Sequence, residues 1–175
     1  MNNLIVLPMA IPLLTAIILV FFRDSIRLVR SLTVVSLLLN IGVSVYILNY
    51  ILHNGIVRLD FGNWLPPFGI LFVADTFAML LVTTTNIVSL IILFYAFFSI
   101  GEKREKLYFY SFAHFLIAGV IGSFLTGDIF NLFVTFEVML LASYVLITLG
   151  ASRAQLIESI KYIAINVISS SLFLI

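Results

Sequence analysis

The chain has 175 residues, of which 63% are hydrophobic and only 10% are charged, and its net charge is +1. Soluble domains carry about 25% charged residues, so this composition excludes an ordinary soluble domain and indicates an integral membrane protein. The small net charge gives no strongly basic surface for nucleic acid. The sequence has no cysteine, which excludes disulfides, thiolate metal sites and iron–sulfur ligation. We therefore expect no cofactor, and expect any redox chemistry to belong to partner subunits.

Six apolar runs are long enough to cross a bilayer, which takes about 20 mostly apolar residues per helix. The sequence therefore predicts an all-α fold, a polytopic transmembrane helical bundle that forms a single domain over residues 1–175. The six membrane helices are expected at about residues 4–22, 32–52, 71–99, 107–125, 128–149 and 155–175. The last run stops without a charge or a polar tail, so we expect the chain to be truncated within the sixth helix.

The segments between the runs differ in character. Residues 53–70 are rich in turn formers and hold one tryptophan, which predicts an ordered loop at the membrane surface. The residues behind this prediction are Gly55, Gly62, Asn63, Trp64, Pro66, Pro67 and Gly69. Residues 101–106 are mostly charged, and we expect this short loop to be solvated.

Basic residues mark the cytoplasmic loops of membrane proteins, and here they are unevenly divided. Arg58 alone falls in the loop on one side of the predicted bundle. The loops on the other side hold Arg23, Arg27, Arg30, Lys103, Arg104, Lys106 and Arg153. We therefore expect the N-terminus to be extracytoplasmic, with the first, third and fifth helices running inward.

Three further titratable residues lie in or beside the apolar runs. Asp75 lies near the start of the third run and Asp128 at the start of the fifth. A carboxylate at such a position caps a helix and is favoured by the helix dipole, so both are predicted to be structural acids. His114 lies about two turns into the fourth run. Because imidazole titrates near neutral pH, His114 is either a proton relay or a packed hydrogen-bonding residue.

The fifth run carries one carboxylate near its midpoint, Glu137. An ionisable group at the centre of a membrane helix costs on the order of 2.5–3.5 kcal/mol on insertion scales, a cost that packing alone rarely justifies. At about 100° per residue, the face of Glu137 also holds Phe130, Phe133, Leu141, Tyr144 and Thr148. The polar members run toward the cytoplasmic end, so this face is predicted to be half of a proton path. The alternative is a protonated carboxyl that bonds to a neighbouring helix.

Lys161 is the second unusual charge, about two turns into the sixth run and three residues after Glu158. One interpretation is that it snorkels to the cytoplasmic interface while pairing with Glu158 across one turn. The other is that it takes part in transport. Asn166, Ser169, Ser170 and Ser171 further along suit close helix packing or the ordering of water.

The segment LFVTFEVMLLASYVLI resembles the fifth transmembrane helix of the antiporter-like subunits shared by respiratory complex I and the Mrp-type cation/proton antiporters. The longer stretch TGDIFNLFVTFEVMLLASYVLI looks most like the D-type members of the Mrp family. The resemblance implies that Glu137 is a proton-translocation residue, with Ser143 and Tyr144 completing the pattern. SIKYIAINVISSSLFLI resembles the sixth helix of the family, which implies a transport role for Lys161. Family members have about fourteen helices, so the chain is expected to be the N-terminal portion of a larger protein.

The leading function hypothesis is a proton-translocating component of a multisubunit Na+/H+ antiporter in a bacterial cell membrane. Its ions are expected to be protons and Na+, and its partners other membrane subunits and lipid. The first alternative is a proton-pumping component of a complex I-like NADH:quinone oxidoreductase or membrane-bound hydrogenase. The second is a structural assembly component whose membrane charges only fix helix register. The sequence has no nucleophile–base pair, phosphate loop or metal-ligand spacing, so a catalytic enzyme is not expected.

Overall fold

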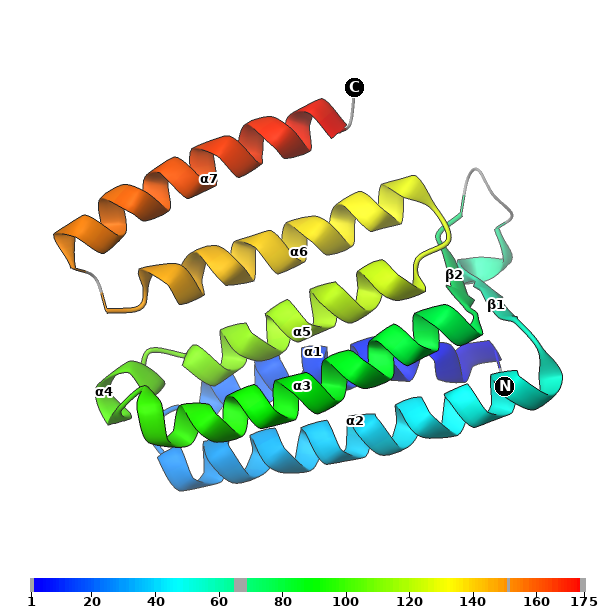
Figure 1. Ribbon diagram of the computed structural model, residues 1–175, viewed down its shortest axis with the longest axis horizontal. Helices are drawn as coiled ribbons and strands as arrows, with labels where there is room; N and C mark the ends of the chain where they lie inside the picture. Colours follow the sequence, from blue (N-terminus) through cyan, green and yellow to red (C-terminus); the bar gives the residue numbers. More distant parts are fainter. Residues whose placement is uncertain (1, 65–68, 151, 174–175) are drawn as a thin grey trace.

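A computed structural model describes residues 2–64, 69–150 and 152–173. Long helices lie side by side with alternating direction, and the short strands and the N-terminus lie at one end of the bundle (Figure 1). The helices are α1 (Leu7–Phe21), α2 (Ile26–Asn54), α3 (Thr76–Ser99), α4 (Glu102–Glu105), α5 (Phe109–Leu125), α6 (Ile129–Thr148) and α7 (Arg153–Phe173). The remaining elements are two 3-10 turns (Asn2–Val6 and Phe61–Asn63) and the strands β1 (Val57–Asp60) and β2 (Leu71–Ala74).

The helices have the length and composition that a bilayer requires. Four helical segments are long and apolar enough to cross a membrane: Asn3–Phe21, Ile26–Asn54, Thr76–Ser99 and Ile129–Thr148. Helix α5 is also apolar and has 17 residues, or roughly 25 Å. Because a bilayer core offers no water to the backbone, the peptide groups must bond within each helix. The predicted polytopic helical membrane bundle is confirmed.

Helix α5 is the centre of the packing, with α1, α3 and α6 against it, while α2 packs on α1 and α3 and α7 packs on α6. Two glycines allow α6 to approach α5 closely. A Cβ atom on Gly119 would lie 2.8 Å from the backbone nitrogen of Met139, and one on Gly122 would lie 2.7 Å from Cγ2 of Thr135. Small residues are the usual means by which membrane helices come this close, and this contact fixes the position of α6.

A small antiparallel hairpin departs from the all-α prediction. Strands β1 and β2 pair in the register Val57 with Ala74 to Asp60 with Leu71. The third helix was predicted to begin at Leu71, which is wrong: residues 71–74 form β2 and α3 begins at Thr76. The hairpin lies within and beside the predicted surface loop. Two of the turn residues named for that loop, Pro66 and Pro67, are outside the described residues, as are the last two residues of the predicted truncated end.

The charged loop is more ordered than the sequence suggested. Residues 102–105 form α4, and the side chain of Glu105 is only 1% exposed. Glu105 accepts two hydrogen bonds from Arg30 of α2, at 2.7 and 3.0 Å, and Arg30 also donates to the carbonyl of Phe97 at 2.9 Å. The prediction that this run is solvated is therefore wrong for Glu105, which clamps the loop to α2 and α3. Arg30 itself lies inside α2, which begins at Ile26 rather than at the predicted residue 32.

A buried amide network joins the first three helices. Asn40 Nδ2 donates to the carbonyl of Pro8 at 3.0 Å and to Oδ1 of Asn86 at 2.9 Å. Asn86 Nδ2 donates to Oγ of Ser44 at 3.1 Å. Asn40, Ser44 and Asn86 have no exposed surface. Hydrogen bonds of this kind give membrane helices a defined register, so this network stabilises the contact of α2 with α1 and α3.

Candidate functional site

Glu137 lies in the middle of α6 on the side that faces away from α5. Thr135 and Ala142 are buried, and Gly119 of α5 packs against the backbone of Thr135 and Met139. At about 100° per residue, Glu137 points to roughly the opposite side of the helix from Thr135. Its side chain is half-buried. The rigid α5–α6 contact therefore sets the direction in which the carboxylate projects.

Tyr144 and Thr148 continue from Glu137 along α6, as the sequence predicted from helical spacing. The ring of Tyr144 is buried and meets Tyr162 of α7 edge to face, with centroids 5.6 Å apart. The Thr148 hydroxyl bonds back to its own helix, to the carbonyls of Tyr144 and Val145 at 3.1 and 2.8 Å. Tyr144 thus joins α6 to α7, while Thr148 is held by its own backbone.

The structure does not bring Lys161 to Glu137. Lys161 Nζ donates to Oε1 of Glu158 at 2.7 Å, and both side chains are more than 60% exposed. Lys161 adjoins Tyr162, which lies level with Tyr144, and Glu137 is seven residues or roughly 10 Å further along α6. Within the described part of the chain, the Glu137 carboxylate has no ion-pair partner.

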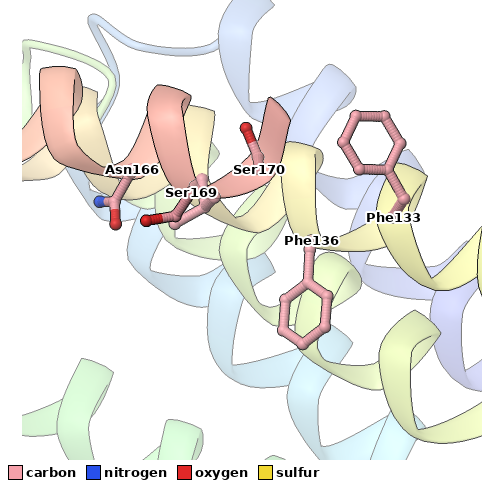
Figure 2. Close-up of a pocket in the computed structure, with 6 residues that line it drawn as sticks. Phe133, Phe136, Asn166, Ser169 and Ser170 are labelled. Atoms are coloured by element: carbon pink, nitrogen blue, oxygen red, sulfur yellow. The ribbon is translucent and has the colours of Figure 1, made fainter. Parts of the chain in front are cut away.

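A pocket of about 180 Å³ opens between α6 and α7, and Glu137 is not among the residues that line it. Phe133, Phe136 and Leu140 line it from α6, and the polar residues of α7 line it from the other side (Figure 2). Those polar residues are Asn166, Ser169 and Ser170. Glu137 is the residue after Phe136, so its carboxylate lies at the level of this pocket. A small, partly polar space therefore lies at the same depth as the carboxylate. The sequence alone suggested only packing or water ordering for the α7 residues.

His114 lies on a different face of α5 and is separate from the Glu137 pocket. It has no exposed surface, and its Nδ1 lies 2.8 Å from the carbonyl of Tyr110. Its other ring nitrogen, Nε2, has no hydrogen-bond partner among the described residues. The burial of His114 and its hydrogen bond agree with a packed hydrogen-bonding residue. Because Nε2 has no partner among the described residues, a role as a proton relay stays a prediction.

The two structural acids lie at helix starts. Asp75 accepts a hydrogen bond from the backbone of Ala78 at 2.7 Å, and Asp128 accepts one from Asn131 at 2.6 Å. The second oxygen of Asp128 accepts from the backbone nitrogen of Leu71 at 2.9 Å. Asp128 therefore caps α6 and also ties β2 to the helix that carries Glu137.

Two further features bear on the chemistry. Within the described residues, no group of three or more histidine or carboxylate side chains is arranged to hold a metal ion.

The ion pair of Arg30 and Glu105 is a feature that the sequence analysis did not predict. These residues are 75 positions apart, so no local sequence pattern indicates their contact. Each of them lies just before an apolar run.

The fold, with its polar groups inside apolar helices, defines a class: a multi-helix membrane protein. No protein-family model matches the chain. Its similarity to known proteins nevertheless extends over its full length. The D subunit of the Na+/H+ antiporter of Bacillus subtilis (strain 168) is 47% identical over 175 residues, which cover 100% of this chain and 36% of the relative. The D subunit from Alkalihalophilus pseudofirmus is 50% identical over 178 residues, with the same coverage.

Two solved structures have the same fold. A chain of the Mrp complex from Dietzia sp. DQ12-45-1b superposes with a TM-score of 0.87 at 30% identity and covers 98% of this chain and 33% of that one. A chain of the membrane-bound sulfane sulfur reductase, an archaeal respiratory membrane complex, has a TM-score of 0.90 at 26% identity, with 99% and 36% covered.

The resemblance expected from the fifth helix is confirmed. Over its whole length the chain is homologous to the D subunits of Mrp-type Na+/H+ antiporters. It spans about a third of the length of the curated relatives that it matches.

Proposed function

We propose that the chain is the part of a multisubunit Na+/H+ antiporter that carries a proton-binding carboxylate, Glu137. One observation carries this proposal: a half-buried carboxylate in the middle of an apolar helix, at the depth of a small pocket and without an ion-pair partner in the described residues. An unpaired carboxylate in a membrane is expensive and is usually retained for function. The names of the relatives supply the expected ions, Na+ and protons.

Glu137 would take up a proton from one side of the membrane and release it to the other. The pocket at its depth offers the amide of Asn166, whose Nδ2 has no hydrogen-bond partner among the described residues and can order water. The hydroxyls of Ser169 and Ser170 also line the pocket, but each already donates to its own helix. Tyr144 extends the path toward the cytoplasmic end of α6. Thr148 is a weaker member of this path, because its hydroxyl is already bonded to its own helix.

Lys161 is proposed to tune the site electrostatically rather than by direct contact. Its ammonium pairs with Glu158 at the exposed end of α7, and an exposed pair of this kind is weak, worth about 0–1 kcal/mol. A small rearrangement of the side chain would release the cation. His114 remains a candidate relay because its Nε2 is buried and free within the described residues.

The basic loops support an orientation for the protein. The segment Phe22–Ser25, α4 and the start of α7 share one end of the bundle, opposite β1 and β2 (Figure 1). With basic residues on the cytoplasmic side, the N-terminus is extracytoplasmic and α6 runs inward. We place the protein in the bacterial cell membrane, in complex with other antiporter subunits.

A redox-coupled proton pump is the second candidate, because the structural likeness to the sulfane sulfur reductase complex is as close as that to the Mrp complex. A purely structural role is the third. The test uses the full-length protein in its complete complex, in everted vesicles with an imposed pH gradient. Antiport predicts that added Na+ collapses the gradient without any electron donor. A gradient that responds only to electron donors would favour the redox pump, and a complex that moves no protons under either condition would favour the structural role.

A further inference from the structure

Helix α1 has a proline in its interior, Pro12, and a side chain from another helix replaces the backbone bond that this proline cannot make. In a continuous α-helix, the carbonyl of Pro8 would accept a hydrogen bond from the N–H of residue 12. Proline has no N–H, and its ring also crowds that carbonyl. Instead, Nδ2 of Asn40 in α2 donates to the Pro8 carbonyl at 3.0 Å. Asn40 therefore supplies the donor that Pro12 lacks.

The chemistry of the Asn40 amide fixes its orientation. A carbonyl can only accept, so Nδ2 rather than Oδ1 of Asn40 faces Pro8. Nδ2 also donates to Oδ1 of Asn86 in α3 at 2.9 Å. The Oδ1 atom of Asn40 is buried and has no hydrogen-bond partner among the described residues. A buried acceptor without a donor is rare in proteins. Asn40 thus leaves its own acceptor unmet while it satisfies the carbonyl of the interrupted helix.

The proline divides α1 into two parts that share one backbone bond fewer than a continuous helix has. Interior prolines are the usual places where helices bend. The part before the break continues the 3-10 turn Asn2–Val6, which contacts both strands of the hairpin. The part after it is held to α2 by Thr15, whose hydroxyl lies 2.7 Å from that of Ser36. The bond from Asn40 to Pro8 therefore holds the first part of α1 to α2, as Thr15 and Ser36 hold the second.

The first part of α1 has space to move. A pocket of about 290 Å³ lies between α1, the hairpin region and the start of α6. The residues that line it from α1 are Val6, Met9, Ala10 and Leu13. At about 100° per residue, they lie on roughly the opposite side of α1 from Pro8, Pro12 and Thr15. If the bond to α2 opened, α1 would therefore bend toward this pocket.

We propose that the proline break makes α1 a hinged helix, and that the Asn40 amide is the latch that holds the hinge closed. When the latch opens, the segment before Pro12 bends away from α2 toward the pocket beside α6. The latch is a hydrogen bond from one side chain, whereas a backbone bond between residues 8 and 12 would make the helix continuous. The hinge does not depend on the antiport proposal, because Glu137 takes no part in it.

The test is hydrogen–deuterium exchange, measured by mass spectrometry on the full-length protein in its complex. The amides of residues 9–13 flank the break, and bending of α1 there opens their backbone bonds. Asn40→Leu keeps nearly the same shape and removes the latch. We expect these amides to exchange about fivefold faster than in the wild type, the effect of losing one hydrogen bond.

Pro12→Ala restores the backbone donor, so it should rescue the loss of the latch. The double variant Asn40→Leu with Pro12→Ala should exchange within about twofold of the wild-type rate. Asn86 loses its partner in the single and the double variant alike, so the rescue reports on the Pro8 carbonyl alone. As a matched control, Ser36→Ala removes the neighbouring contact of α2 with α1 and should leave the exchange of residues 9–13 unchanged.

Exchange at the wild-type rate in Asn40→Leu would overturn the proposal, since the amide would hold nothing closed. A double variant that exchanges as fast as Asn40→Leu would overturn it as well, because the amide would not stand in for the missing N–H. If Asn40→Leu does not assemble, Pro12→Ala alone decides: the added bond should slow exchange by about twofold or more, and an unchanged rate would contradict the hinge. The readout does not involve Na+/H+ exchange, so its result is independent of whether the antiport proposal holds.

Discussion

Replacing Gly119 with alanine should move α6 and with it the carboxylate of Glu137. A Cβ atom at Gly119 would lie 2.8 Å from the backbone nitrogen and 2.9 Å from the Cβ of Met139. Carbon atoms pack without strain at about 3.5–4.0 Å, so α6 must retreat by roughly half an ångström. The obstructing atoms include backbone and cannot turn aside. Overpacking of this kind costs about 1–3 kcal/mol.

Gly42 in α2 provides a matched control, because a Cβ atom there has no neighbour within 4 Å. Both substitutions gain the same helix propensity, about 1 kcal/mol for alanine over glycine. The difference between the two variants therefore isolates the clash. We expect Gly119→Ala to be less stable than Gly42→Ala by about 1–3 kcal/mol, and to slow ion exchange as well.

The assay is thermal unfolding of the purified complex, followed by ion exchange in vesicles at equal protein content. Gly42→Ala should match or exceed the wild-type midpoint, whereas Gly119→Ala should unfold at lower temperature. If Gly119→Ala is as stable as Gly42→Ala, the close contact of α5 with α6 does not exist as described. The structural basis for the direction of Glu137 would then be lost.

Three further outcomes are expected. Glu105→Gln should destabilise the complex by about 1–3 kcal/mol, because it weakens the charge-assisted hydrogen bonds from Arg30, whose side chain is 33% exposed, while a double replacement of both residues by methionine should recover most of the loss in thermal unfolding. Lys161→Ala should leave assembly and stability unchanged, since its pair is exposed, but should slow Na+-dependent proton exchange, which Lys161→Arg should preserve. The 175 residues have no cysteine, so a single cysteine at Lys103 should react only from the cytoplasm and one at Ile56 only from outside.

Each of these outcomes can fail in its own way. A Glu105→Gln variant as stable as the wild type would mean that the pair does not clamp α4. Undiminished exchange by assembled Lys161→Ala complexes would leave that lysine with a surface role alone. Labelling of both introduced cysteines from the same side would discard the orientation of α6.

The helices could be predicted because an apolar run of about 20 residues indicates a membrane helix. The position of the hairpin could not be predicted in this way. Leu71–Ala74 is as apolar as the helix that follows it, so hydropathy joined the two. The better signal was Asp75, a capping residue that marks where α3 begins. The pairing of β2 with β1 depends on contacts between residues on the two sides of a loop. The hydropathy of a single segment contains no information on such contacts.

The candidate site was predictable only in part. Glu137, Tyr144 and Thr148 share one face because helical spacing is fixed, and Asp128 is recognisable as a cap from its place before α6. By contrast, the burial of Glu105 depends on Arg30, which is 75 residues away. The free nitrogen of His114 depends on the carbonyl that its other nitrogen meets. These contacts depend on how the helices pack in three dimensions, so they could not be predicted from the sequence alone.

The central claim is that Glu137 carries the transported proton. Glu137→Gln keeps the volume and the hydrogen-bonding ability of the side chain but cannot bind or release a proton. Glu137→Asp keeps the titrating group and withdraws it by about one methylene, a gap that a water molecule can bridge. The direct measurement is Na+-dependent proton exchange by the full-length protein in its complex, in everted vesicles, with assembly checked on native gels. We expect the Gln variant to assemble and to show no exchange, and the Asp variant to retain part of it. Wild-type exchange by an assembled Gln variant would contradict the account and remove Glu137 from the mechanism.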